Sequence, residues 1–193
     1  MGGQYYYKTA IMMREALLVN GILFNSEVWY NISEKELREL EEVDETFLRR
    51  ILKAHSKTPI EAFYLELGCI PLRYIIMSRR VNFLYYLTNL KHDEMLYKFF
   101  QAQVISPIKN DCIVTVNENL NHLKIHVTSE DIEGKSKGIF KKEIKTKIQL
   151  AALKYLKDKA SGHSKMEKLE YKKLSLQSYL YSIFSVNLKL NNY

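Results

Sequence analysis

Glycine and proline are scarce in this chain, which holds seven glycines and three prolines among 193 residues. Because these two residues interrupt regular structure, their scarcity leaves long stretches that can form helices. Two cysteines, Cys69 and Cys112, are too few and too far apart for a disulfide framework or a CxxC metal site. A reducing compartment therefore fits the composition best.

Long hydrophobic runs are also missing. The longest apolar stretch, residues 16–24, is broken by Asn20 and Gly21. A membrane span needs about 20 mostly apolar residues, so we expect no association with a membrane. The first residues lack the charged and apolar regions of a secretory signal. We therefore expect an intracellular protein of the nucleus or the cytoplasm.

Motifs that carry catalysis are not found either. Nucleotidyl transfer by two metal ions needs clustered carboxylates, but the five aspartates are dispersed along the chain. No Gly-rich phosphate loop and no GxSxG motif occurs. We therefore expect that this chain is not an enzyme, and that it has no cofactor and no small-molecule substrate.

A fragment of a zinc site is the nearest thing to a metal motif. His122 and His126 are four residues apart and would share a helix face, with Cys112 upstream. Two or three ligands without a fourth make a weak site. Polar positions around the end of a helix explain the two histidines better, so we expect no metal.

The pattern of apolar residues predicts an all-α fold. Ser33 and Glu36 form a capping box, and Thr58, Pro59 and Glu61 give a second helix start that Gly68 ends. Periodic segments predict helices at residues 9–29, 33–52, 58–67, 71–90, 92–103, 114–123 and 136–160. The pattern breaks near Pro107, which divides the chain into domains at residues 1–104 and 112–193.

One arginine falls within an apolar helix face. Spacing places Leu72, Ile76 and Phe83 on one side of the helix at 71–90, with Arg79 in the middle. A buried guanidinium needs a carboxylate partner, because an unpaired buried charge costs several kcal/mol. We predict a structural ion pair between Arg79 and Glu66, with Glu61 as the second choice.

Positive charge is concentrated late in the chain. Residues 135–173 hold 13 lysines and four carboxylates, a net charge of +9, whereas the whole chain carries +7. Such a segment would attract nucleic-acid phosphates without reading their sequence. An ordinary solvated helix is the alternative interpretation, because the lysines spread around the helix. The candidate phosphate contacts are Lys137, Lys141, Lys142, Lys145 and Lys157, with Arg49 and Arg50 as weaker candidates.

Several runs resemble one family in their order and spacing. LLVNGILFNSEVW (17–29) and EVDETFLRRIL (42–52) resemble the segment that follows the catalytic palm in non-LTR, LINE-like retrotransposon reverse transcriptases. TPIEAFYLELGCIPLR (58–73) and HSKMEKLEYKKLSLQSYL (163–180) are similar to later stretches of such elements. Together these runs indicate a piece of a mobile-element protein.

The resemblance implies a helical thumb-like domain followed by a smaller, basic helical extension. In the intact polymerase these parts would contact the primer-template duplex and flanking RNA. The paired aspartates of the palm and the terminal Cys/His box have no counterpart here, so no polymerase activity is implied for this chain alone. The expected partners are the RNA or DNA backbone, bound weakly and nonspecifically, and the missing polymerase domains of a longer product. The alternative is a helical protein-interaction module or a functionless remnant.

Overall fold

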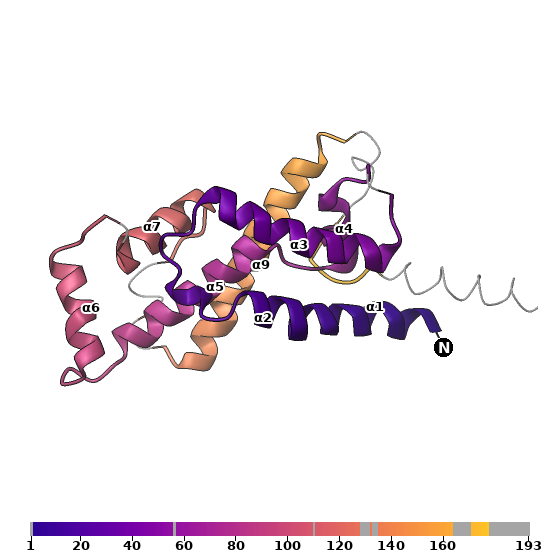
Figure 1. The fold of residues 1–193 in the computed structure, drawn as a ribbon. Helices are drawn as coiled ribbons and strands as arrows, with labels where there is room; N and C mark the ends of the chain where they lie inside the picture. Colours follow the sequence, from indigo (N-terminus) through magenta and orange to yellow (C-terminus); the bar gives the residue numbers. More distant parts are fainter. Residues whose placement is uncertain are drawn as a thin grey trace, which may run out of the picture. The chain divides into compact units, whose positions relative to one another are not determined.

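The computed structural model describes residues 2–55, 57–109, 111–127, 132, 135–163 and 171–177. These residues form helices and no strand, so the predicted all-α class is confirmed (Figure 1). No helix within the described ranges combines the length and apolar character needed to cross a membrane. The chain divides into two compact units: the first is residues 1–24, 38–72 and 152–193, and the second is residues 25–37 and 73–151.

The first unit opens with one continuous helical stretch. Helix α1 (Gly2–Met13) passes into the π-helical turn η1 (Arg14–Val19) and the short α2 (Asn20–Ile22). The predicted helix at 9–29 therefore starts and ends earlier. The helical stretch ends at Ile22, and in the turn that follows Asn25 takes a left-handed conformation with φ 55°, which a short polar side chain tolerates. A single 3₁₀ turn, η2 (Ser26–Val28), follows it in the second unit.

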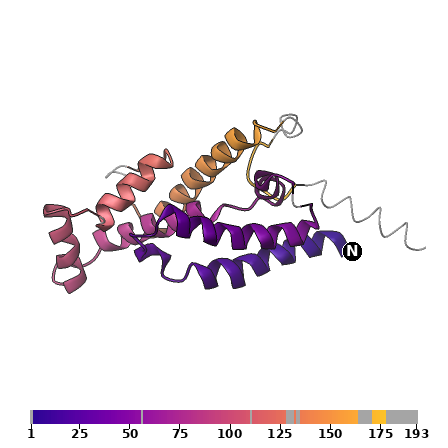
Figure 2. The same ribbon diagram turned by 45° about the horizontal axis from the view of Figure 1, so that its top comes forward.

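Helix α3 (Glu34–Leu52) runs antiparallel to α1 over its part in the first unit, and the two lie side by side in both views (Figures 1 and 2). Tyr7 shares a buried cluster with Leu48 and Ile51, whereas Arg14 reaches Asp44 one turn earlier in α3. The α3 residues that point inward recur at three- and four-residue spacing, as the sequence predicts.

The predicted capping box at the start of α3 is confirmed. The Glu36 amide donates to Ser33 Oγ at 3.2 Å, and the Ser33 amide donates to Glu36 Oε2 at 2.8 Å. Both contacts satisfy amide hydrogens that the first turn of a helix leaves without partners.

Helix α4 (Ile60–Leu67) confirms one predicted end and corrects the other. It ends at Gly68, whose φ of 66° is left-handed, and the Cys69 amide bonds to the Tyr64 carbonyl at 3.0 Å. It begins after Pro59 without a side-chain cap, so the predicted capping role of Thr58 and Glu61 is wrong. The Thr58 carbonyl instead accepts a 2.8 Å hydrogen bond from Arg49.

The segment 171–177 packs on α4. Tyr171 is buried and donates to Glu66 Oε1 at 2.6 Å, and the Gln177 amide donates to the Glu66 carbonyl at 3.0 Å. A Cβ on Gly68 would lie 2.3–2.6 Å from the Ser175 backbone, so only glycine admits this close approach. The contact thus supplies partners to carbonyls at the end of α4.

An apolar cluster of described residues forms the core of the first unit. Its members come from α1, α3, α4, the end of α9 (Lys137–Ala160) and segment 171–177, and the main ones are Tyr7, Leu48, Ile51, Phe63, Leu65, Leu67, Leu153, Leu156 and Tyr171. Each fully buried aliphatic or aromatic side chain stabilises the folded state by about 1.5–3 kcal/mol relative to an exposed one.

The second unit is built on α5 (Leu72–Thr88), with α6 (Met95–Ile105), α7 (Cys112–His122) and the first part of α9. Tyr85 of α5 stacks on Phe140 of α9 with ring centroids 4.3 Å apart. Its hydroxyl donates to the Lys135 carbonyl at 2.7 Å, which fixes the start of α9. The loop at 106–111, predicted as a domain boundary, joins α6 to α7 within this unit.

The buried face of α5 differs from the predicted one. Arg79, expected in its middle, and Phe83, expected on the same side, are only half-buried. Arg80 is 3% exposed instead, with Tyr74, Met77, Val81 and Leu84 also buried. The helix carries apolar residues on most of its circumference, so spacing alone does not define one face.

Candidate nucleic-acid interface

The five predicted phosphate-binding lysines are all exposed on α9. Four of them belong to the second unit, whereas Lys157 belongs to the first. Successive residues of an α-helix are about 100° apart, so Lys137, Lys141, Lys142 and Lys145 fall on one arc of about 140°. We call these four residues the lysine arc. At about 1.5 Å per residue, the arc extends along roughly 12 Å of the helix.

The apolar side of α9 explains why the arc faces solvent. Six of its buried residues recur every four positions: Phe140, Ile144 and Ile148 in the second unit, then Ala152, Leu156 and Ala160 in the first; Leu153 is buried beside them. Four residues rotate about the helix axis by about 400°, which is 40° more than a full turn. The buried stripe therefore winds slowly around the helix from one end to the other. Ala151 and Tyr155, which adjoin this stripe, are only half-buried. In the second unit the lysine arc occupies positions that the stripe leaves exposed.

Other lysines of the region are held by the protein itself. Lys135 forms an ion pair with Glu143 at 2.6 Å, and Lys147 donates to the His126 carbonyl at 2.9 Å. Among the described residues, none pairs with the four side chains of the lysine arc or with Lys157. Binding of an anion to the arc therefore breaks no ion pair with a described residue. When the anion is nucleic acid, the release of its counterions favours binding.

The two weaker candidates differ from the arc. Arg49 donates to the Thr58 carbonyl, and its guanidinium lies 4.9 Å from the centroid of the Phe63 ring. These contacts hold the connection between α3 and α4, which gives Arg49 a structural role. Arg50 is exposed.

The predicted pair of Arg79 and Glu66 remains a prediction. Arg79 Nη1 lies 3.5 Å from Ser26 Oγ within the second unit. Glu66 belongs to the first unit, where it accepts from Tyr171. Burial raises the pKa of Glu66, and the hydrogen bond from Tyr171 opposes that shift.

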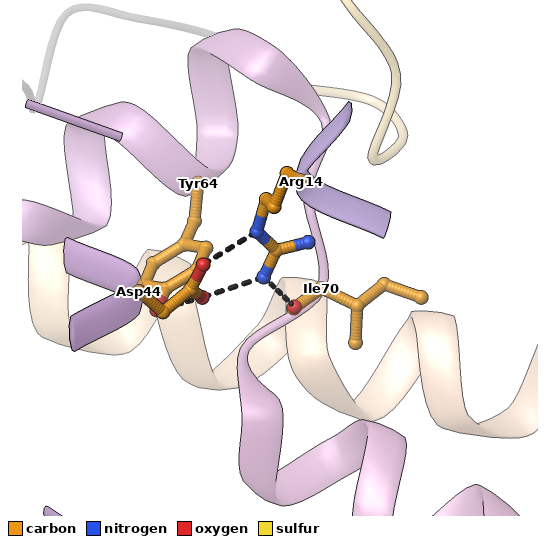
Figure 3. A network of polar contacts seen from close by, with 4 residues as sticks. All are labelled: Arg14, Asp44, Tyr64 and Ile70. Carbon is orange, nitrogen blue, oxygen red and sulfur yellow. Dashed lines mark hydrogen bonds and ion pairs between the residues drawn. The ribbon is translucent and has the colours of Figure 1, made fainter. Parts of the chain in front are cut away.

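A buried ion pair that the sequence-based reasoning missed lies in the first unit (Figure 3). Arg14 contacts both carboxylate oxygens of Asp44, with Nε to Oδ1 at 2.6 Å and Nη2 to Oδ2 at 2.5 Å. Arg14 also donates to the Ile70 carbonyl at 3.0 Å, and the Tyr64 hydroxyl donates to Asp44 at 3.0 Å. Both charged side chains are almost fully buried.

The electrostatics of this pair follow from its burial. Burial alone would lower the pKa of Arg14, but the hydrogen bond and charge of Asp44 outweigh it and raise that pKa above its usual value. Burial and the Asp44 charge also raise the pKa of Tyr64. Both effects keep Arg14 charged and Tyr64 protonated. The available signal was Asp44 itself, a carboxylate within the apolar stripe of α3.

The zinc-site fragment is not assembled. Helix α7 ends at His122, and His126 follows in the loop, so the two histidines do not share a helix face. Cys112 lies at the other end of α7, where its side chain is hydrogen-bonded to Tyr30. Within the described residues, no three His, Cys, Asp or Glu side chains are grouped to hold a metal ion.

Comparison with protein-family models, curated proteins and solved structures finds no match to this chain.

Proposed function

We propose that this chain is a helical, thumb-like segment of a non-LTR retroelement reverse transcriptase, and that it contacts nucleic-acid backbone through the lysine arc. The observation that supports the contact is the arc itself: four exposed lysines of α9 on one side of the helix, none paired with a described residue. The family is supported by the sequence runs that resemble the region after the palm.

The chemistry of the arc defines the kind of binding. Lysine ammonium groups are compact point charges on flexible stems, so they attract phosphates without fixing an orientation. Among the residues that the structure describes, no aromatic ring contacts the four lysines of the arc. We therefore expect weak binding to RNA and DNA alike, without sequence preference and without polymerase activity of this chain alone.

An electrophoretic shift tests the proposal. The full chain is titrated against mixed-sequence RNA and duplex DNA at low salt, and the series is repeated at higher salt. Each neutralised phosphate adds about 0.9 to the slope of log affinity against log salt on duplex DNA. We expect micromolar binding with a slope of roughly 3–4 from four lysines. No binding at low salt contradicts the proposal.

A second function is favoured by one other observation. Helix α6 exposes an apolar face, with Met95 72%, Phe99 59% and Ile105 78% exposed. Large exposed apolar patches mark interaction surfaces. The alternative is therefore a helical protein-interaction module. Its expected partner is the set of missing polymerase domains of a longer product. The remaining alternative is a remnant that binds nothing.

Light scattering after gel filtration separates these alternatives. An interaction module without its partner domains leaves the apolar face of α6 uncovered, so it is expected to self-associate through that face. Phe99→Ser should return it to a monomer. A monomer that binds nucleic acid supports the first function. A monomer without nucleic-acid binding is the result expected of the remnant.

A further inference from the structure

A small pocket lies within the second unit. Its volume is about 50 Å³, and a single water needs roughly 10–15 Å³ on the same measure. The pocket therefore has room for a group of a few heavy atoms. Its polar lining comes from the segment before α3, from the first turn of α3, and from α5 and α7: Tyr30, Glu34, Arg73, Arg80, Asn119 and His122.

Arg80 is the buried charge of this pocket. Its side chain is 3% exposed, and Nη2 donates to the Trp29 carbonyl. Its Nε is buried and has no hydrogen-bond acceptor among the described residues. No described carboxylate forms an ion pair with it. Burial lowers the pKa of Arg80, against the opposing effects of Tyr30 and Cys112. A buried cation without an anion is an unfavourable arrangement that a bound anion would relieve.

The rest of the lining adds to this positive charge. Arg73 is 17% exposed, and its guanidinium lies 3.7 Å from the Glu34 carboxylate. Glu34, the carboxylate of the lining, is 77% exposed, so solvent screens most of its charge. On the α7 side, Asn119 and His122 offer polar nitrogens. The charged groups that line the pocket are thus two guanidinium groups and one solvated carboxylate.

The contrast with Arg14 shows what is missing at Arg80. Asp44 contacts two nitrogens of the buried Arg14, and the Ile70 carbonyl takes a further hydrogen bond. Arg80 has one carbonyl partner and lines a pocket instead. A planar guanidinium matches the paired oxygens of carboxylates and phosphates.

We propose that this pocket binds a tetrahedral oxyanion of the phosphate type, held by the guanidinium groups of Arg80 and Arg73. Asn119 and His122 also line the pocket and would contribute further hydrogen bonds. The site is separate from the lysine arc and does not depend on it. The oxyanion is either free phosphate or a terminal phosphate group of an oligonucleotide, and the experiment separates these two sources.

An NMR titration tests the site in the full-length chain. The Nε–H resonance of Arg80 is followed as inorganic phosphate is added at constant ionic strength, with chloride as the reference. We expect a saturable shift with phosphate and none with chloride. Arg73→Gln should weaken phosphate binding about tenfold or more, since it removes a charge-assisted hydrogen bond. An Nε–H resonance that ignores phosphate, or follows chloride equally, overturns the proposal.

Two further arms make the result independent of folding and of the lysine arc. Arg80→Gln removes the Nε–H itself, so in this variant phosphate is followed at the side-chain amide of Asn119, another lining residue, and the response there should be lost. Circular dichroism checks that the variant folds; if it does not, the wild-type titration and Arg73→Gln still decide. The variant with all four arc lysines changed to Gln should keep its phosphate response. Loss of that response would mean that the arc, and not the pocket, binds the anion, which overturns the proposal.

The last arm compares oligonucleotides that carry a 5′-phosphate or a 5′-hydroxyl. A shift of Arg80 Nε–H with the phosphorylated strand alone assigns the site to a terminal phosphate. Shifts with inorganic phosphate but with neither strand assign it to the free anion. Both outcomes support an oxyanion site, and shifts of equal size with both strands contradict it.

Discussion

Arg14 and Asp44 form a bidentate ion pair in the core of the first unit, although 30 residues separate them in the sequence. The pair connects the π-helical turn η1 to α3, and through the Ile70 carbonyl it reaches the chain beyond α4. It therefore ties together three segments that share one hydrophobic core.

Removing one partner of this pair should be strongly destabilising. Arg14→Met leaves the Asp44 carboxylate buried without its cation, and the expected loss in the free energy of unfolding is about 3–5 kcal/mol. The double variant Arg14→Met/Asp44→Leu should recover much of that loss, because no unpaired charge remains. Urea unfolding followed by circular dichroism measures both. Arg50→Met, an exposed arginine of α3, is the control and should change stability by less than about 0.5 kcal/mol. A loss below about 1 kcal/mol for Arg14→Met would contradict a buried, matched pair.

Gly68 should tolerate no side chain. Alanine there meets a left-handed backbone, which costs about 1–2 kcal/mol, and its Cβ would also displace the Ser175 backbone. Gly138→Ala is the matched control, because nothing lies within 4 Å of its added Cβ and helix α9 favours alanine by up to about 1 kcal/mol. Chemical unfolding compares the two variants. Hydrogen exchange at the Gln177 amide should become faster in Gly68→Ala alone. Equal effects of the two substitutions on stability would contradict the left-handed backbone at Gly68, and unchanged exchange at the Gln177 amide would contradict the packing of segment 171–177 on α4.

Glu66 should make stability depend on pH. Burial raises its pKa in the folded state. A carboxyl with a raised folded pKa contributes its full stabilisation below its unfolded pKa, and that contribution is lost as pH rises through the folded value. Gln does not titrate, so the stability of Glu66→Gln relative to wild type should increase from pH about 4 to about 7. Unfolding curves at a series of pH values measure this difference. A difference that stays constant or falls across this range would contradict the burial of Glu66.

Local signals in the sequence predicted local structure well. Ser33 with Glu36, and Gly68 after α4, act within a few residues of themselves, and the structure confirms both. The cap at Thr58 was wrong because Pro59 occupies the cap position of α4, so Thr58 lies one residue too early. Its carbonyl accepts from Arg49, a contact that sequence spacing does not show.

Long-range contacts could not be predicted in the same way. The choice between Arg79 and Arg80 depends on which neighbours cover α5, and a helix with apolar residues on most sides fits several arrangements. The pair of Arg14 with Asp44 requires knowing that α1 and α3 lie antiparallel. The lysines of α9 could be named from sequence, and helix geometry alone groups four of them on one arc. That this arc faces solvent depended on which residues of the helix are buried, and sequence did not show this.

The most direct test of the account compares two variants of equal charge in nucleic-acid binding. One changes the lysine arc, Lys137, Lys141, Lys142 and Lys145, to Gln. The other changes four exposed lysines elsewhere, Lys8, Lys91, Lys98 and Lys109, and so lowers the net charge equally. Electrophoretic shifts with mixed-sequence RNA and duplex DNA at low salt should show binding lost in the arc variant and largely kept in the control. Equal losses in both variants would show that net charge alone, and not the lysine arc, attracts nucleic acid.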